Sequence, residues 1–139
     1  EGKTILLMGD KSEEVLGKKI EDSNHSSAII NTIGKTSILE LIGIINNAEL
    51  TIGVDSGVAH LSGALNKKTL VLWGPSIFSK SHPLGNNVHY INLNKPCAPC
   101  MGPGLFSPQE AIDKCDYKLS CMNDISIDLV YDSICDILK

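Results

Sequence analysis

Short apolar runs alternate along this chain with segments of helical spacing, and this alternation limits the possible folds more than any other feature. Several of the runs are apolar on both faces, as buried parallel strands are. The expected strands are Ile5–Met8, Ala28–Ile30, Leu50–Val54, Thr69–Trp73 and Val88–Ile91. Strands that alternate with helices over short connections form parallel sheets. The sequence therefore predicts an α/β fold with a Rossmann-like parallel sheet flanked by helices.

The helical segments begin at residues that cap helices well. Asp10 has Glu13 three residues later and Ser37 has Glu40, which is the spacing of a capping box. Ser126 precedes the last helix. Apolar residues then recur at the spacing of one helix face. The expected inner-face residues are Val15, Leu16 and Ile20; Ile38, Leu41, Ile42 and Ile45; Val58, Leu61 and Leu65; and Ile127, Val130, Ile134 and Leu138.

Composition places the chain among globular domains. It has 139 residues, of which 42% are hydrophobic, and a net charge of −4. That is enough apolar side chain for a core and excludes disordered and fibrous classes. The acidic balance without a basic cluster argues against nucleic acid as a partner. The longest apolar stretch, Ile38–Ile45, contains Glu40, so no transmembrane segment is expected, and no signal peptide is visible.

The first predicted strand follows only three residues, and the chain has no initiator methionine. We therefore expect residues 1–139 to be one domain that is a fragment, the C-terminal portion of a longer protein. Residues 94–125 are expected to form an irregular, cysteine-rich segment within it.

The segment Val54–Leu61 is the most informative about function. A strand ends there, a tight turn follows and a helix opens, and ligands of doubly wound folds lie beyond such strand ends. Ser56 and Gly57 would lie at the helix N-terminus, where unpaired N–H groups and the helix dipole favour phosphate. Asp55 and His60 would face the same crevice. The alternative is structural: a capping residue before the helix and a solvated histidine in its first turn.

The loop from Pro75 to Asn87 also follows a strand end, so it could close over a ligand. It carries Lys80, which could meet phosphate or simply be a solvated surface lysine. Trp73, at the end of an apolar strand, is expected in the core.

Four cysteines cluster in the irregular segment: Cys97, Cys100, Cys115 and Cys121. A structural zinc site, two disulfides and packed reduced thiols are all open interpretations, because the spacing alone does not separate them. No neighbouring residue marks any of these thiols as a catalytic nucleophile. Cys135 stands apart on the last helix and is expected to be a packing residue.

Two stretches, Asp55–Leu65 and Thr69–Ser76, resemble the signature of the ADP-heptose:lipopolysaccharide heptosyltransferases of glycosyltransferase family 9. Gly34–Ser37 is similar to the family segment before the preceding helix, and Cys97-x-x-Cys100 with Cys121–Met122 resembles the tail of many members. Lys68 departs from the pattern, because members commonly have proline there. The similarity covers nearly the whole chain in matching order.

The resemblance implies the two-domain GT-B architecture. This chain would be the C-terminal, nucleotide-sugar-binding half, without its first strand and helix. The N-terminal half would bind the acceptor and carry the catalytic base, so no catalytic residue is expected in this fragment and the fragment alone would be inactive. The reaction would be an inverting transfer of heptose or a related sugar to a lipopolysaccharide-type or other glycan acceptor.

The resemblance also implies roles for individual residues. Asp55 would hold hydroxyls of the donor sugar, and His60 would orient the phosphates or Asp55. The amides of Ser56, Gly57 and Val58 would bind the diphosphate. Thr36 would contact the nucleobase and Glu13 the ribose, although the capping box explains Glu13 equally well.

These roles imply partners and a location. The donor would be a nucleotide-diphosphate sugar, ADP-heptose first, and a glycan or lipid-linked acceptor would bind through the missing domain. Catalysis would need no cofactor, because N–H groups and a helix dipole stabilise the leaving diphosphate; zinc would be structural. The expected location is the cytoplasm, peripherally at the inner membrane face. The alternative function is a non-catalytic nucleotide-binding domain or a Cys-rich, metal-stabilised interaction domain.

Overall fold

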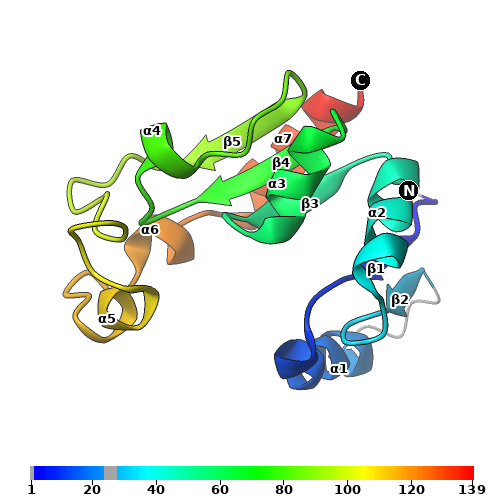
Figure 1. Cartoon of the computed structure of the whole chain (residues 1–139), viewed down its shortest axis with the longest axis horizontal. Coiled ribbons are helices and arrows are strands. Elements are labelled where there is room, and N and C mark those ends of the chain that lie inside the picture. The colour runs from blue at the N-terminus through cyan, green and yellow to red at the C-terminus, as the bar shows by residue number, and fades with distance from the viewer. Residues whose placement is uncertain (1, 24–27) are drawn as a thin grey trace. The chain divides into compact units, whose positions relative to one another are not determined.

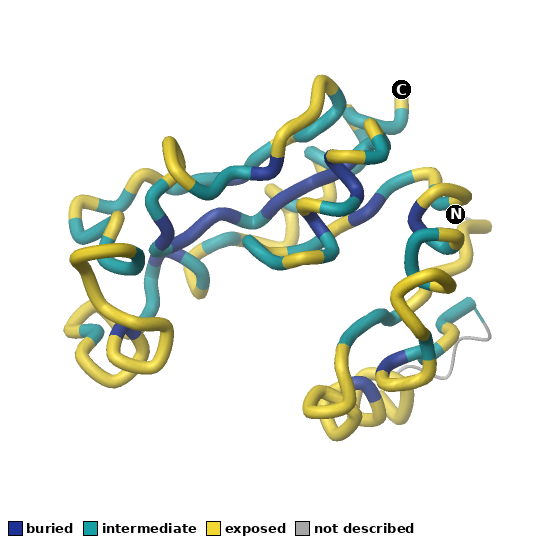
Figure 2. The backbone as a smooth tube through the Cα atoms, in the orientation of Figure 1, coloured by how far each residue is buried: buried dark blue, intermediate teal, exposed yellow. Residues whose placement is uncertain are grey.

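The computed structural model describes residues 2–23 and 28–139. The chain forms two compact units, Glu1–Gly43 and Ile44–Lys139, and the boundary between them falls within helix α2 (Ile38–Asn47). Figure 1 shows the elements of each unit, and Figure 2 shows where the backbone is buried.

The first unit contains a parallel pair of strands joined through a helix. Its elements are β1 (Ile5–Leu7), the 3-10 turn η1 (Lys11–Glu13), α1 (Glu14–Ser23) and β2 (Ile29–Asn31). β1 and β2 pair in parallel, with Ile5 opposite Ile29. The predicted strand–helix–strand order is therefore confirmed in this unit, with ends shifted by one residue.

The capping box predicted at Asp10 is confirmed. The Asp10 carboxylate accepts a hydrogen bond from the Ser12 N–H at 2.6 Å, and Glu13 accepts one from the Asp10 N–H at 3.1 Å. The predicted inner face of this helix is wrong, because Val15 and Leu16 are 70% and 57% exposed.

The buried residue of α1 is Gly17. A Cβ at Gly17 would lie only 2.5 Å from the Ile33 Cδ1 atom. The helix therefore packs through a glycine, where its backbone approaches Ile33 closely, and not through its larger apolar side chains.

Helix α2 begins where the sequence predicts. The Glu40 carboxylate accepts hydrogen bonds from both the N–H and the hydroxyl of Ser37, at 2.8 and 2.7 Å. Of the predicted inner face, Ile45 is fully buried, Leu41 and Ile42 are half-buried, and Ile38 is exposed. The predicted stripe is thus correct toward the C-terminal end of the helix and wrong at its first residue.

The second unit is built on a three-stranded parallel sheet in the order β3–β4–β5. The strands are β3 (Thr51–Val54), β4 (Thr69–Trp73) and β5 (Val88–Asn92). Thr69 lies opposite both Thr51 and Val88, so β4 is the central strand. Figure 2 shows the buried stretch along it. All three strands agree with the prediction to within one residue at each end.

Helix α3 (Gly57–Ala64) packs against this sheet. The buried cluster joins Ala59 of α3 to Val71 and Trp73 of β4, so the prediction that Trp73 belongs to the core is confirmed. The predicted sheet-facing residues of α3 are confirmed only in part: Val58, Leu61 and Leu65 are half-buried, whereas the fully buried residues are Ala59, Ser62 and Gly63.

The small residues of α3 explain this difference. A Cβ at Gly63 would lie 2.5 Å from the Leu84 carbonyl oxygen, so only glycine allows that approach. The Ser62 and Thr69 hydroxyls share a buried hydrogen bond of 2.7 Å, which satisfies both polar groups inside the core.

Four further helices follow in the second unit. They are α4 (Phe78–Ser81), α5 (Pro108–Asp113), α6 (Ser120–Asn123) and α7 (Ile127–Leu138). The segment 94–125 is therefore not wholly irregular, because α5 and α6 lie in it. In Figure 1, α3 lies in front of the sheet and α7 behind it.

The cap predicted for α7 is confirmed, since the Ser126 hydroxyl accepts a hydrogen bond from the Leu129 N–H at 3.2 Å. Val130, Ile134 and Leu138 are half-buried as expected, whereas Ile127 is 86% exposed. Ile127 is the first residue of the helix, where the chain enters it from the surface. Within residues 2–23 and 28–139, none of the helices combines the length and the apolar composition that crossing a bilayer requires.

Candidate functional site

The turn between β3 and α3 has the geometry that the sequence predicts. β3 ends at Val54, and Ser56 is the N-cap of α3 with extended backbone angles. The Ser56 side chain makes no capping hydrogen bond. The structural interpretation of Ser56 as a side-chain cap is therefore wrong, and the opening N–H groups of α3 are not satisfied by that hydroxyl.

Asp55 and His60 lie together at this turn. The Asp55 Oδ1 and His60 Nε2 atoms are 3.2 Å apart, and the two side chains are 19% and 45% exposed. The Ser81 hydroxyl lies 3.5 Å from the other carboxylate oxygen of Asp55 and 3.1 Å from Ile77 O, and its single proton can serve only one of these acceptors at a time. Asp55 is thus approached by side chains from two elements, α3 and α4.

The space around Gly57 is open. A Cβ built at Gly57 would meet no other atom within 4 Å. Gly57 is therefore not required by the packing of the chain itself. An approaching ligand would come close to the backbone there because no side chain intervenes.

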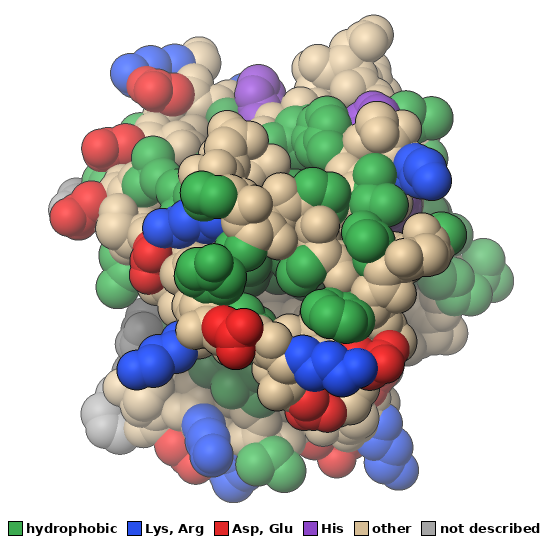
Figure 3. Space-filling view, turned by 90° about the vertical axis from the view of Figure 1, so that its left-hand side faces the viewer, with side chains coloured by type: hydrophobic (Ala, Val, Ile, Leu, Met, Phe, Trp, Pro, Cys, Tyr) green, Lys and Arg blue, Asp and Glu red, His purple; other side chains and the backbone are tan. Residues whose placement is uncertain are grey.

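A pocket of about 490 Å³ lies beside Asp55. One wall comes from the loop after β4, and the other comes from residues 101–108 with Glu110. The pocket lining includes Asp55, Ser76, Lys80, Ser81, Phe106 and Glu110. Figure 3 views the molecule from the side of α5 and shows hydrophobic side chains on this face with charged ones around them.

The sequence indicated the first wall, because the loop from Pro75 follows a strand end. It gave no indication of the second wall. Pro75 O accepts hydrogen bonds from the N–H groups of Cys100 and Met101, each at 3.0 Å, and these bonds bring the two walls together. Backbone pairing between loops so far apart in the chain has no local sequence signal.

Three aromatic side chains, Phe78, His82 and Tyr90, cluster near Asp55. Tyr90 donates a hydrogen bond to Pro83 O at 2.5 Å and packs edge-on against Phe78, with ring centroids 4.9 Å apart. The His82 ring stacks on the Phe78 ring with centroids 4.7 Å apart, and its centroid lies 6.3 Å from that of Tyr90. Burial, and then the Asp55 carboxylate, raise the pKa of Tyr90. Tyr90 therefore stays a neutral hydrogen-bond donor beside the site.

Two of the predicted site residues belong to the first unit. Glu13 takes part in the capping box of Asp10, as the structural interpretation expects. Thr36 is half-buried in the loop before α2. Their roles toward a ribose and a nucleobase remain predictions, whereas Asp55, Ser56, Gly57, Val58 and His60 follow one another at one turn of the second unit.

All five cysteines are free thiols in this structure. Cys100 is bonded through its N–H to Pro75 O, and the Cys121 Sγ atom lies 3.5 Å from a Cβ built at the adjoining Gly74. The Cys115 Sγ atom accepts a hydrogen bond from the Leu119 N–H at 3.2 Å. Three of the clustered cysteines thus lie around the end of β4 and the start of α6.

Burial, and then neighbouring thiols that include Cys97 and Cys115, raise the pKa of Cys100 and of Cys121. Within the described part of the chain, no three His, Cys, Asp or Glu side chains are grouped so as to hold a metal ion. The zinc site of Cys97, Cys100, Cys115 and Cys121 stays a prediction.

Comparison with known proteins points to one family. The sequence model of glycosyltransferase family 9 (heptosyltransferase) matches residues 1–105. Lipooligosaccharide heptosyltransferase 2 of Campylobacter jejuni (strain NCTC 11168) is 30% identical over 139 residues, which cover 97% of this chain and 41% of the relative. Lipopolysaccharide heptosyltransferase 1 of Pseudomonas aeruginosa is 30% identical over 96 residues, 69% of this chain and 26% of that protein.

Solved structures agree in fold. The structure of Escherichia coli ADP-heptose lps heptosyltransferase II is similar with a TM-score of 0.76 and 20% identity, over 97% of this chain and 36% of that one. A family 9 glycosyl transferase from Veillonella parvula gives a TM-score of 0.76 at 18% identity, over 99% of this chain and 37% of that one. The predicted α/β, GT-B-type fold class is confirmed. The chain spans about two fifths of the length of the relatives it matches along its whole length.

Proposed function

This chain belongs to glycosyltransferase family 9, and on that premise we propose that it forms the donor-binding part of a bacterial heptosyltransferase of lipopolysaccharide synthesis. The donor is a nucleotide-diphosphate sugar, with ADP-heptose as the first choice, because the name of a structural relative includes it. The observation that carries the proposal is the pairing of Asp55 with His60 at the turn that opens α3.

The turn suits a diphosphate for electrostatic reasons. The amides of Ser56, Gly57 and Val58 open α3, where the helix dipole is positive. The open space at Gly57 lets phosphate oxygens come near these N–H groups. Asp55 cannot itself bind phosphate, since like charges repel, so it takes the role of accepting hydrogen bonds from sugar hydroxyls.

The transfer is a single displacement at the anomeric carbon of the sugar. An acceptor hydroxyl oxygen forms a bond to that carbon as the bond from carbon to the diphosphate oxygen breaks, so the configuration inverts. The hydroxyl proton goes to a base in the part of the protein that binds the acceptor, and the nucleoside diphosphate leaves. The amides and dipole of α3 stabilise the leaving group as its negative charge grows.

The same electrostatics would let the step proceed without a divalent cation, because fixed dipoles already supply positive potential at the leaving group. The acceptor is a lipopolysaccharide-type glycan or another lipid-linked glycan. It binds outside the part of the protein described by these residues, so this chain alone has no transferase activity. Such an acceptor places the enzyme in the cytoplasm, peripherally at the inner membrane face.

The test is calorimetric titration of the intact protein with ADP-heptose, ADP, UDP and GDP. Asp55→Ala is compared with Asp132→Ala, which removes an exposed carboxylate from α7. We expect binding that is tightest for the adenine ligands, loss of ADP-heptose binding in Asp55→Ala, and no change in Asp132→Ala.

The other outcomes are informative. Tighter binding of UDP or GDP would keep the donor site and change the sugar donor. If the folded protein binds none of these ligands, the proposal fails, and a non-catalytic role of the domain takes its place. Loss of the fold in Asp55→Ala with unchanged affinity per folded molecule would assign Asp55 a structural role.

A further inference from the structure

The pocket beside Asp55 contains two charged side chains, Lys80 and Glu110, to which the proposed donor-binding site gives no role. Three charged side chains line it: Asp55, Lys80 and Glu110. The two carboxylates are already engaged. Asp55 meets His60 and Ser81, as described above.

Glu110 is engaged from its own helix. Its carboxylate accepts hydrogen bonds from the N–H and hydroxyl of Ser107, at 3.0 and 2.8 Å, and pairs with Lys114 at 3.1 Å. These hydrogen bonds and this ion pair lower the pKa of Glu110, so the carboxylate remains charged and satisfied.

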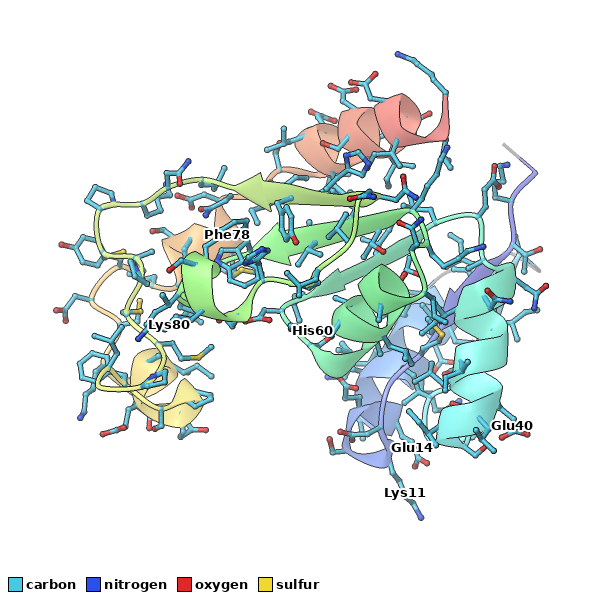
Figure 4. All side chains as sticks on the ribbon, turned by 45° about the horizontal axis from the view of Figure 1, so that its top comes forward. Lys11, Glu14, Glu40, His60, Phe78 and Lys80 are labelled. Atoms are coloured by element: carbon cyan, nitrogen blue, oxygen red, sulfur yellow. The ribbon has the colours of Figure 1, made fainter. Side chains whose placement is uncertain are left out.

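Lys80 differs from both carboxylates. Within the described part of the chain, no hydrogen bond or ion pair engages its ammonium group. Figure 4 shows Lys80 extending from α4 toward the loop that carries residues 101–108. The pocket therefore contains one cation whose charge is not neutralised by the protein.

The position of Lys80 is fixed by its backbone. The N–H groups of Lys80 and Ser81 both donate to Ile77 O, at 3.0 and 3.1 Å, in the turn of α4. The hydroxyl of Ser81, the next residue, lies 3.5 Å from a carboxylate oxygen of Asp55. Lys80 is thus the sequence neighbour of Ser81, whose hydroxyl lies near Asp55, and Asp55 directly precedes the first amides of α3.

The composition of the chain adds a reason to expect this lysine to act. All twelve basic residues are lysines, and the sequence has no arginine. A diphosphate carries two or more negative charges at neutral pH, and proteins commonly meet them with Arg or Lys. In this pocket, Lys80 is the residue that can supply such a charge.

We propose that Lys80 binds phosphate oxygens of the nucleoside diphosphate, across the pocket from the 101–108 loop. The inference rests on the proposed function, since it names a further contact of the same donor. It also gives the cysteine-rich segment a place in the site: that segment forms the wall opposite the cation, held to Pro75 by the N–H groups of Cys100 and Met101.

The experiment compares Lys80→Ala, Lys80→Arg and a control, Lys19→Ala, which removes an exposed lysine from α1. The intact protein is titrated with ADP, AMP and adenosine at two salt concentrations. Lys80→Ala should raise the Kd for ADP about tenfold and lower its salt dependence, because a charge-assisted hydrogen bond is lost. The effect should be smaller for AMP and absent for adenosine. Lys80→Arg should restore most of the affinity, and Lys19→Ala should match the wild type.

Three results would overturn the inference in different ways. An unchanged Kd for ADP in Lys80→Ala, with the wild type binding ADP, removes Lys80 from the site and leaves the proposed function intact. An equal loss for ADP and adenosine means that the substitution disturbs the pocket rather than a phosphate contact. A folded wild type that binds no ADP, UDP or GDP overturns the proposed function and this inference with it.

Discussion

The Asp55 carboxylate and the His60 imidazole meet at 3.2 Å across a turn, since Asp55 directly follows β3 and His60 lies in the first turn of α3. The contact crosses the turn that carries Ser56 and Gly57, so it sets the direction in which both side chains point. Both remain open to solvent in part. A partly exposed pair of this kind adds little to stability, about 1 kcal/mol or less.

Replacing His60 with alanine should therefore weaken nucleotide binding more than it lowers stability. We expect the Kd for ADP to rise about fivefold, as loss of one hydrogen-bonding partner typically produces, and the Tm to change by only a few degrees. Calorimetric titration and thermal melts measure the two effects. His89→Ala, on the exposed side of β5, is the control and should leave the affinity unchanged. An unaltered affinity in His60→Ala would remove His60 from the site.

Gly57→Ala tests whether the empty space at the turn is reserved for a ligand. The added methyl group meets no atom of the protein within 4 Å, so the Tm should be unchanged or slightly higher. Affinity for ADP should fall about tenfold or more, because the methyl group occupies space next to the α3 amides. Gly43→Ala in α2 adds a methyl group that is equally free of contacts and should not alter ADP binding. Equal affinities in the two variants would count against phosphate binding at Gly57.

Tyr90 provides a prediction on pH. Burial and the Asp55 carboxylate raise its pKa, so the folded protein holds the phenol proton more tightly than the unfolded chain. The corresponding stability is present below the ordinary tyrosine pKa and is lost as the pH rises through the folded pKa. Asp55→Asn should shift Tyr90 ionisation to lower pH, though burial should keep it above the ordinary value.

Tyrosinate absorbance during alkaline titration measures this shift, with Tyr117 and Tyr131 replaced by phenylalanine so that the signal comes from Tyr90. Both of those tyrosines are exposed, which makes the replacements mild. If the titration curves are the same with and without the Asp55→Asn substitution, the carboxylate does not act on Tyr90.

The thiols of Cys100 and Cys121 should be slow to alkylate. Their raised pKa values leave little thiolate at neutral pH, and thiolate is the reactive form. Iodoacetamide should modify both sites more slowly in the folded protein than in urea, and their rates should rise at higher pH than in the unfolded chain. Peptide mass spectrometry after timed quenching gives the rate at each site. Equal rates in folded and unfolded protein would show that the cluster does not protect these thiols.

The helix and strand ends that the sequence predicted well are those determined by residues close to them in the chain. Asp10, Ser37 and Ser126 begin helices because their side chains bind N–H groups two or three residues away, and the structure confirms all three. The strand Thr69–Trp73 was predicted with both of its ends because its apolar run stops at Gly74–Pro75.

The inner faces of helices were predicted less well. The periodicity of α3 points to Val58, Leu61 and Leu65, yet the helix packs through Ala59, Ser62 and Gly63. Close packing of backbone on a sheet favours small residues, a preference that a hydrophobicity pattern does not contain.

The candidate site likewise has a part that the sequence predicted and a part that it did not. Asp55, Ser56, Gly57 and His60 lie within six positions of one another, so one motif was enough to find them. Ser81 comes near Asp55 through a tertiary contact, and the 101–108 wall is placed by backbone hydrogen bonds to Pro75 O. Neither partner of these contacts carries a sequence motif that would predict them.

Lys68, where the sequence resemblance leads us to expect a proline, makes a contact far along the chain. Its ammonium donates to the carbonyl of Ile137 at 2.6 Å, across 69 positions of sequence. Carbonyls in the last turn of a helix lack partners within the helix, and a cation there opposes the helix dipole. A proline has no group that could make this bond. The Lys68 side chain therefore ties the residue that precedes β4 to the last turn of α7, two segments that no strand pairing joins.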